Sequence, residues 1–261
     1  MHTKMEKSIK LSAIVITFNE ERNIGRCLDS LKEVADEIIV VDSFSTDKTE
    51  LICNQQPLVT FVKQSWLGYS AQKNFANALA SHDYIFSIDA DEALSPELVE
   101  SIKKIKNNPV TDIYIVKRLT NYCGQWIKHC GWYPDKKIRI WKKKDAEWQG
   151  EIHETLRLKN NLSSSELQGD LLHYSYYTIK EHLNQVNNYT ELLAIEALKK
   201  GKKSSVLQLF FSPLVKFIKS YFIQLGFLDG YYGFIVSTIA AQTTFYKYLK
   251  IHELLKKKSN N

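Results

Sequence analysis

The stretch DYIFSIDADE, residues 83–92, passes from a short apolar run directly into a group of carboxylates. The β-branched and aromatic residues of its first part are typical of a strand that is buried inside a sheet. Three earlier runs have the same character and are also bounded by polar residues: Ser12–Phe18, Glu37–Asp42 and Leu58–Lys63. The pattern therefore predicts four strands in the first third of the chain.

Segments with helical spacing lie between these runs. Their apolar residues recur on one face, and the segments are Glu20–Leu31, Asp47–Asn54 and Tyr69–Ala80. In the last segment we expect Phe75, Ala76 and Leu79 to face inward. Each of the first three predicted strands is thus followed by a stretch long enough to form a helix.

Helix start signals support this order. Asp47 with Glu50 three residues later resembles a capping box, Ser95–Glu97 has proline at the first helical position, and Thr178–Glu181 opens a helix that extends to Lys200. Alternating strands and helices predict βαβ units, hence an α/β fold with a mostly parallel sheet flanked by helices. Two further strands are predicted at Ile113–Arg118 and Lys137–Trp141.

The composition is that of a globular protein, with 44% hydrophobic and 25% charged residues. The four cysteines form no CxxC pair, which argues against a zinc ribbon or a disulfide scaffold. The charged start of the chain leads into only a short apolar run, unlike a secretory signal. These features predict a cytoplasmic protein.

Polar residues follow the predicted strands, where ligands bind in open α/β sheets. They are Thr17, Asn19 and Glu20 after the first strand, Asp42–Asp47 after the second, and Asp89–Glu92 after the fourth. The sequence contains no GxGxxG motif after the first strand and no GxxxxGK[ST] motif. Dinucleotide-dependent dehydrogenases and P-loop nucleotidases are therefore disfavoured.

The pair Asp89 and Asp91 is the sharpest of these signals. Two carboxylates that leave a buried strand can offer oxygen ligands to Mg²⁺ or Mn²⁺, and such a metal commonly bridges a carboxylate and a diphosphate. The alternative is a solvated turn, because this spacing also occurs by chance. Asp42 can similarly accept hydrogen bonds from a base or a ribose, whereas Asp47 is expected only to cap the next helix.

The order of these motifs resembles glycosyltransferase family 2, the nucleotide-sugar transferases of the GT-A fold. The matching motifs are TFNE (Thr17–Glu20), DSxSTD (Asp42–Asp47), QKN (Gln72–Asn74) and DADE (Asp89–Glu92). Later segments look like the subgroup of bacterial lipopolysaccharide core β-glucosyltransferases: Gly131–Asp135, Lys137–Trp141, Trp148–Glu154, Leu171–Tyr176 and Gly226–Gly230. The resemblance extends from about Leu11 to Lys250.

The resemblance implies an inverting, metal-dependent transferase that moves a hexose, glucose from UDP-glucose, to a lipid-linked acceptor such as the lipopolysaccharide inner core. In the nucleotide-sugar site, Asp42 would contact the uracil, and the other residues would be Thr17, Asn19, Glu20, Lys73 and Asp89. Asp89 and Asp91 would hold Mg²⁺ or Mn²⁺, with Asp91 the better ligand. Another surface glycan or a protein stays open as the acceptor.

Catalysis needs a carboxylate that takes the proton of the attacking hydroxyl. The best match to the family's catalytic position is His153-Glu154, with Glu151 and Asp135 as alternatives for the base. Direct attack inverts the anomeric centre, whereas double displacement would need a second carboxylate as nucleophile, and both routes stay open.

Other candidates have structural alternatives. Lys73 and Arg139 can pair with phosphates or be surface cations, and Trp132 and Tyr133 can stack on a sugar or pack in the core. We assign Trp132, Tyr133, Asp135 and Arg139 to the acceptor or sugar site. His153 can bind a metal, donate to the leaving phosphate or be structural, and His173 and Tyr174 are expected to be structural.

The chain divides into a predicted transferase domain, residues 1–175, and a helical extension, residues 176–261. From Lys199 onward there are eleven lysines and two acidic residues, a net charge of +9, which leaves −3 for the rest. The longest charge-free stretch, Gly230–Tyr246, is short for a membrane-spanning helix. We expect the extension to lie on anionic lipid at the cytoplasmic face of the inner membrane, with packing or dimerisation as alternatives.

Two other classes of protein would explain parts of the sequence. A nucleic-acid-binding module would explain the basic extension, but no recognition motif is present and the carboxylates would have no purpose. A nucleotidyltransferase would have a similar sheet, but a glycine-rich activating loop is missing. We therefore expect no nucleic-acid partner.

Overall fold

A computed structural model describes residues 8–150, 154–159, 161–201 and 204–259. The chain forms two compact units, each described by itself. The first unit comprises Met1–Arg118 and Asp135–Tyr174, and the second comprises Leu119–Pro134 and Ser175–Asn261. The second unit thus combines the C-terminal helices with a short segment from the middle of the chain.

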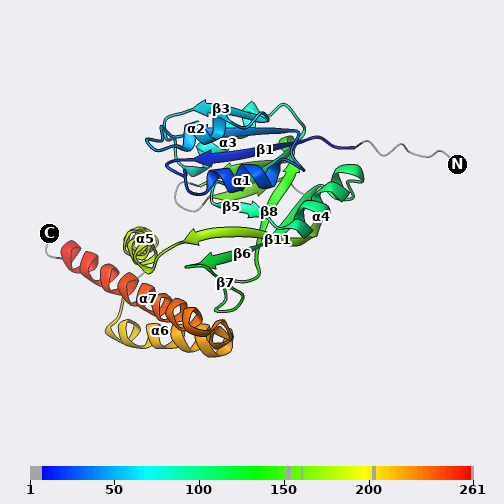
Figure 1. Cartoon of the computed structure of the whole chain (residues 1–261). Coiled ribbons are helices and arrows are strands. Elements are labelled where there is room, and N and C mark those ends of the chain that lie inside the picture. The colour runs from blue at the N-terminus through cyan, green and yellow to red at the C-terminus, as the bar shows by residue number, and fades with distance from the viewer. Residues whose placement is uncertain (1–7, 151–153, 160, 202–203, 260–261) are drawn as a thin grey trace. The chain divides into compact units, whose positions relative to one another are not determined.

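The first unit is built on four parallel strands, as predicted (Figure 1). They are β1 (Leu11–Thr17), β2 (Glu37–Asp42), β3 (Val59–Lys63) and β4 (Tyr84–Asp89), in the order β3-β2-β1-β4. Thr17 pairs with Asp42, and Ile16 pairs with Asp89. The carboxyl ends of three strands therefore meet at one edge of the sheet.

Antiparallel strands extend this sheet beyond β4. β8 (Asp135–Lys142) pairs with β4, and the order continues through β6 (Ile113–Tyr122), β11 (Ser164–Tyr176) and β5 (Glu92–Leu94). β6 and β8 include the two further strands that the sequence predicts. A short 3₁₀ turn, η1 (Lys143–Asp145), leads to a separate hairpin of β9 (Ala146–Gln149) and β10 (Thr155–Leu158).

Helices cover both faces of the sheet. Because side chains alternate along a strand, Ala13 and Val15 pack with α1 (Ile24–Leu31) and α4 (Pro96–Asn107) in one core cluster. Ile14 points the other way, into a second cluster with α3 (Tyr69–Leu79) and β9. A short helix, α2 (Thr49–Asn54), precedes β3. This arrangement confirms the predicted α/β fold with a sheet between helices.

Two local predictions were wrong. Leu79 is 43% exposed, because the buried face of α3 is formed instead by Gln72, Lys73, Ala76 and Asn77. Asp47 and Glu50 form no capping box, because the N-cap position of α2 is one residue later, although the Asp47 carboxylate accepts hydrogen bonds from the backbone N–H groups of Glu21 and of Thr49, the first residue of α2. The N-cap of α2 is Lys48, which makes no side-chain cap.

The other two start signals were correct. The hydroxyl of Ser95 accepts a hydrogen bond from the Leu98 N–H at the start of α4. Thr178 and Glu181 form a complete capping box at the start of α5 (Ile179–Lys199) in the second unit.

The second unit contains mainly helices. After α5 come α6 (Val206–Ile218), a π turn η2 (Lys219–Ile223), a 3₁₀ turn η3 (Gly226–Asp229) and α7 (Gly230–Ser259), which packs against α5 and α6. The last residues of β6 pair with β7 (Gln125–Ile127), and this hairpin also belongs to the second unit. The buried Asp229 accepts hydrogen bonds from the backbone N–H groups of Lys128 and His129, which ties this hairpin to the helices.

Candidate functional site

Two loops at the carboxyl edge of the sheet are bonded together. The N–H of Asn19 donates to the Ser45 hydroxyl over 2.7 Å, and the side-chain oxygen of Asn19 accepts from the Thr46 N–H over 2.8 Å. Asn19 has a φ of 54°, a left-handed conformation that asparagine tolerates better than most residues. The TFNE and DSFSTD motifs therefore form one continuous rim.

Asp42 lies beneath this rim. It is fully buried, and its two carboxylate oxygens accept hydrogen bonds from the backbone N–H and the hydroxyl of Ser45. The neighbouring hydroxyl of Thr17 is also buried, and it has no hydrogen-bond partner among the described residues. The structure thus brings Thr17, Asn19 and Asp42 together, as the sequence predicted.

Glu20 belongs to the TFNE motif and also lies near Asp91, one of the two aspartates of the DADE motif. Its N–H donates to the Thr49 hydroxyl, and its carboxylate accepts from the side-chain amide of Asn23. Burial raises the pKa of Glu20, and the negative charge of nearby Asp91 adds to this rise. Glu20 and Asp91 are therefore close enough for their charges to repel each other.

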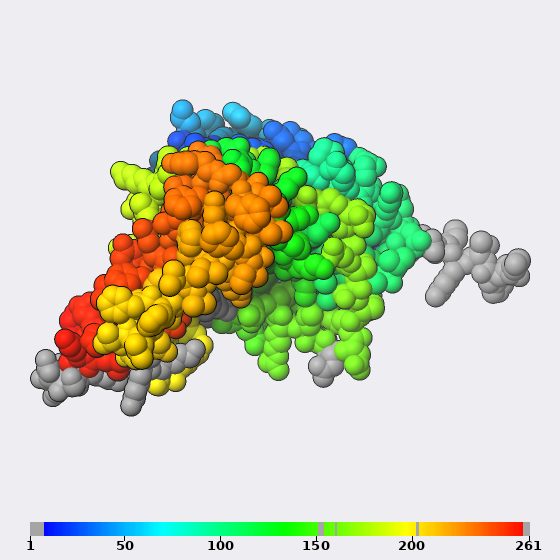
Figure 2. Space-filling model, turned by 90° about the horizontal axis from the view of Figure 1, so that it is seen from below, coloured from blue at the N-terminus to red at the C-terminus, as the bar shows by residue number. Residues whose placement is uncertain are grey.

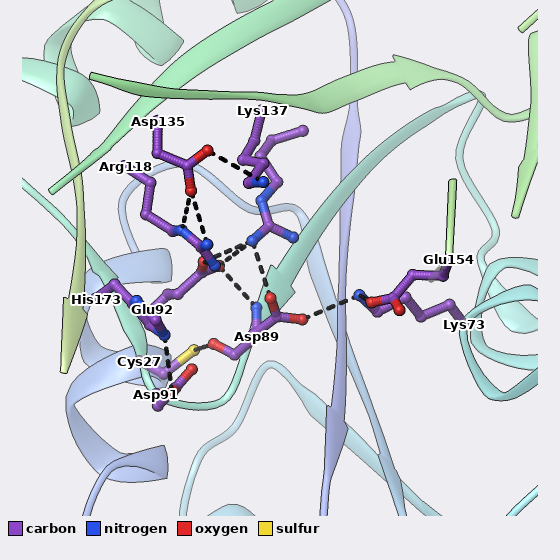
Figure 3. A network of polar contacts seen from close by, with 11 residues as sticks. Cys27, Lys73, Asp89, Asp91, Glu92, Arg118, Asp135, Lys137, Glu154 and His173 are labelled. Atoms are coloured by element: carbon purple, nitrogen blue, oxygen red, sulfur yellow. Dashed lines mark hydrogen bonds and ion pairs between the residues drawn. The ribbon is translucent and has the colours of Figure 1, made fainter. Parts of the chain in front are cut away.

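Asp89, at the end of β4, is held by two buried cations (Figure 3). Its Oδ2 lies 2.9 Å from Nη2 of Arg139, and its Oδ1 lies 3.2 Å from Nζ of Lys73. Burial raises the pKa of Asp89, but the charges of Arg139 and Lys73 outweigh burial and hold this pKa well below its usual range. Both oxygens of Asp89 are thus already engaged by cations of the protein.

Glu92 is a functional candidate that sequence reasoning missed. It is buried at the start of β5, where both its oxygens accept from Arg139, and Arg118 lies 3.4 Å away. Burial raises the pKa of Glu92, and the charge of Arg139 only partly offsets this rise. The one signal in the sequence was its place in the DADE motif, which does not reveal burial.

Asp91, which lies between Asp89 and Glu92 in the sequence, contacts a histidine of β11. Its Oδ2 is 3.1 Å from Nε2 of His173, on β11. The next residue, Tyr174, stacks under the guanidinium of Arg26, which lies 3.7 Å from the ring centre. His173, expected to be only structural, is thus a direct neighbour of the predicted metal ligand.

Glu154 and Asp89 both form ion pairs with the same lysine, Lys73. Nζ of Lys73 is 3.3 Å from Oε1 of Glu154 and 3.2 Å from Oδ1 of Asp89 (Figure 3). The same ammonium group lies 4.6 Å from the ring centre of Trp148. Lys73 is therefore buried between two carboxylates. The predicted residues His153 and Glu151 lie outside the described residues.

Asp135, the other predicted base, sits at the start of β8 in ion pairs. Its Oδ2 accepts from Nε and Nη2 of Arg118 at 3.0 and 2.7 Å, and its Oδ1 lies 3.1 Å from Lys137. Arg139, predicted for the acceptor or sugar site, is buried and forms ion pairs with Asp89 and Glu92. Both residues thus belong to one network of charges in the first unit.

Trp132 and Tyr133 belong to the second unit. The Trp132 ring contacts Tyr122, Tyr176 and His182 at centroid distances of 5.8 to 6.1 Å, and the peptide bond from Tyr133 to Pro134 is cis. Trp132 therefore has a packing role in this aromatic cluster, and stacking on a sugar stays a prediction.

The carboxylates at the carboxyl edge of the sheet are suited to bind a divalent cation for which substrate oxygens supply further ligands. Among the described residues, no group of three or more His, Cys, Asp or Glu side chains is arranged to hold a metal ion. Magnesium sites at phosphates commonly use only one or two carboxylates, with substrate oxygens as further ligands. Asp91 fits this role better than Asp89, because two cations of the protein already engage Asp89.

Comparisons with known proteins agree with this geometry. The family model described as "Glycosyl transferase family 2" matches residues 12–155. An uncharacterized glycosyltransferase of Rickettsia typhi is 35% identical, over 96% of this chain and 89% of its own length. The lipopolysaccharide core biosynthesis glycosyltransferase LpsC of Rhizobium meliloti is 28% identical, over 95% of this chain and 94% of its own length.

A solved structure supports the fold. The mannosyltransferase PcManGT from Pyrobaculum calidifontis, in complex with GDP-Man and Mn²⁺, matches with a TM-score of 0.55 and 13% identity, over 93% of this chain and 87% of that one. The fold is therefore GT-A-like. Given the family match across more than half its length, the chain belongs to glycosyltransferase family 2 and is a glycosyltransferase.

Proposed function

We propose that the protein is an inverting, metal-dependent hexosyltransferase that moves glucose from UDP-glucose to a lipid-linked acceptor. The observation that carries the proposal is the position of Lys73 between Asp89 and Glu154, at 3.2 and 3.3 Å. Asp89, at the donor edge, and Glu154 are thus both held by the ammonium group of Lys73. This arrangement suits a reaction in which one group binds the donor and the other takes a proton.

Glu154 is the proposed base. It would accept the proton of the acceptor hydroxyl as that oxygen attacks the anomeric carbon, and direct attack inverts this centre. The alternative Asp135 has both oxygens in ion pairs with Arg118 and Lys137, which leaves it poorly suited to accept a proton. We therefore assign a structural role to Asp135.

The donor would occupy the edge formed by the TFNE and DSFSTD motifs. Asp42, Thr17, Asn19 and Glu20 would recognise the nucleoside, and the buried Thr17 hydroxyl has no hydrogen-bond partner among the described residues. Asp91, with Asp89, would hold Mg²⁺ or Mn²⁺, which offsets the negative charge of the leaving nucleoside diphosphate when it is bound. The structural neighbour PcManGT was solved with a nucleotide sugar and Mn²⁺.

The acceptor proposal rests on relatives and motifs. LpsC is named for lipopolysaccharide core biosynthesis and aligns with nearly the whole chain. We propose an inner-core acceptor that is anchored to lipid, and accordingly a place at the cytoplasmic face of the inner membrane. The second candidate is a family 2 transferase that acts on another surface glycan or on a protein, which the same catalytic residues would serve.

The decisive experiment is a binding screen by calorimetry. UDP, GDP, TDP and CMP nucleotides are titrated with and without Mn²⁺ into the wild type, Asp91→Ala and the control Asp29→Ala, a surface residue paired with Lys32. We expect UDP to bind in a Mn²⁺-dependent way to the wild type and to the control, and not to Asp91→Ala. Equal UDP binding by all three proteins would contradict the assignment of Asp91.

Product analysis tests the chemistry. When UDP-glucose and extracted core acceptors are supplied, the new glycosidic bond should have the configuration opposite to that of the donor, as read by NMR. Retention of configuration would contradict direct attack and would favour a covalent intermediate.

A further inference from the structure

The solvent-facing side of α6 is apolar, which is the reverse of an ordinary surface helix. Seven large apolar residues recur at helical spacing on this side and are each between 42% and 69% exposed: Val206, Leu207, Phe210, Phe211, Leu214, Val215 and Ile218. No residue of α6 is buried. We call these seven residues the α6 face.

The turns after α6 continue this surface. Phe222 and Ile223 at the end of η2 are 56% and 71% exposed, and Phe227 and Leu228 in η3 are 45% and 58% exposed. Between α6 and α7 lies an open apolar groove of about 390 Å³, lined by residues that include Leu214, Phe217 and Phe245. Figure 2 shows α6 and these turns, in yellow and orange, at the surface of the second unit. Exposed apolar surface of this extent marks an interaction site.

The charged residues of the segment that contains the α6 face are all positive. Between Ser204 and Leu228 the sequence contains no acidic residue, and its charged residues are Lys216 and Lys219. With Gln208 and Ser212, these lysines follow at helical spacing and form a polar strip beside the α6 face. An apolar stripe bordered by lysine is the pattern of a helix that lies in the interface of an anionic bilayer.

Crossing a membrane is a poorer fit for the same residues. Val206–Ile223 is the one described helix whose length and composition would allow a span, with 18 residues and a mean hydropathy of 1.3. A span needs about 20 predominantly apolar residues. Lys216 and Lys219 would lie inside this one, and Pro213 interrupts it.

We propose that the α6 face, with the η2 and η3 turns, inserts shallowly into the surface of an anionic bilayer, parallel to the membrane plane. The proposal rests on the proposed membrane location and adds the surface that makes the contact. It assigns the contact to α6 and not to the lysine-rich end of α7. There, Lys250 donates to the Asn187 backbone oxygen, and Lys257 pairs with Glu253.

Vesicle co-sedimentation of the full chain tests this assignment. The vesicles contain phosphatidylcholine with or without phosphatidylglycerol, and neither glycan nor donor is present, so the result is independent of transferase activity. The wild type should bind the anionic vesicles and be released by alkaline carbonate. Failure to bind them would overturn the proposal, and resistance to carbonate would overturn the surface mode in favour of a span.

Substitutions locate the contact. Leu207→Glu with Phe211→Glu should weaken vesicle binding by more than about tenfold, because two apolar side chains no longer enter the bilayer. The matched control is Leu183→Glu with Leu192→Glu, two exposed leucines of α5 in the same unit, which should bind as the wild type does. Equal loss in both double variants, or loss in neither, would overturn the assignment to α6.

Two further arms distinguish an anionic lipid surface from a second copy of the chain. Lys216→Gln with Lys219→Gln should reduce the preference for anionic vesicles more than Lys256→Gln with Lys257→Gln does, and the opposite order would overturn the proposal. If the wild type is a dimer by light scattering, becomes a monomer with Leu207→Glu and Phe211→Glu, and binds no vesicles, a second copy covers the face instead. Mn²⁺-dependent UDP binding, measured on the same samples, reports separately on the proposed function.

Discussion

Arg139 and Glu92 form a buried ion pair. Nη2 of Arg139 lies 2.5 and 2.7 Å from the two oxygens of Glu92, and the two residues are 3% and 1% exposed. The same nitrogen reaches Asp89 at 2.9 Å. Because an isolated buried charge is costly, Glu92 stabilises Arg139, and Arg139 in turn holds Asp89 in place.

Glu92→Gln should therefore destabilise the fold. Glutamine has nearly the same shape but no charge, so the buried guanidinium would lose its main counterion. We expect the free energy of unfolding to fall by about 3 to 5 kcal/mol, measured by urea denaturation. Because the two residues act as a pair, the double variant with Arg139→Gln should lose less than the sum of both single losses. Strict additivity would contradict the pairing.

Glu154→Gln should remove most of the transferase activity without weakening donor binding. Loss of a general base typically lowers the rate by about 10² to 10⁴-fold. The measurement is kcat with saturating donor, together with the dissociation constant for UDP by calorimetry. Lys73→Met should affect both quantities, since Lys73 contacts Asp89 as well as Glu154.

Asp135→Asn is the matched control for the base. Its carboxylate is paired with Arg118 and Lys137, so its substitution should lower stability more than kcat. A larger loss of kcat in Asp135→Asn than in Glu154→Gln would reverse the assignment of the base.

His182 should make the second unit sensitive to acid. It is buried beside Tyr122, whose hydroxyl lies 3.0 Å from its Nδ1, and burial lowers the pKa of His182 to about 4. The unfolded chain has a histidine pKa of about 6.5, so the unfolded state binds the proton first as the pH falls. This contribution to stability is complete above about pH 6.5 and is lost as the pH falls towards about 4.

We expect this loss to reach about 2 to 3 kcal/mol by pH 4. The measurement is the free energy of unfolding against pH, for the wild type and His182→Gln. The curve of the variant should be flatter between about pH 6.5 and 4. Parallel curves for both proteins would show that His182 is not the group that titrates.

Gly169→Ala should be far more destabilising than Gly68→Ala. Both glycines belong to the first unit and have nearly the same φ, 90° and 91°, so alanine is strained at either position. At Gly169, however, a Cβ would lie 2.3 Å from the backbone nitrogen of Leu98, whereas at Gly68 it would meet nothing within 4 Å. Thermal denaturation of both variants measures the difference.

For Gly68→Ala we expect the loss from backbone strain alone, about 1 to 3 kcal/mol, because φ 91° and ψ 157° lie in a region that is essentially restricted to glycine. For Gly169→Ala we expect clearly more, because α4 must move away from β11. Similar melting temperatures for the two variants would mean that the close approach of these elements is relaxed in solution.

The regular elements of the first unit could be predicted because their signals are local. The apolar runs around Val15, Val40 and Phe86 match β1, β2 and β4, and the hydroxyl cap at Ser95 is present. In the second unit, the predicted cap at Thr178 is present as well. Leu79 was misplaced because hydrophobic periodicity alone cannot show that a helix will bury polar residues. On α3, Lys73 is buried by its ion pairs with distant carboxylates.

Local sequence thus decided β1 to β4, β6 and β8, the helix starts at Ser95 and Thr178, and the order of motifs that places the chain in its family, because propensity, periodicity and capping act over a few residues. It did not reveal β5, β7, β9, β10 or β11. The tertiary structure decided which charges meet. Glu92 pairs with Arg139, which is 47 residues away in the sequence, and Lys73 pairs with Glu154, which is 81 residues away. Such pairs form only when sheet register and helix packing bring the segments together, and no local signal in the chain encodes them.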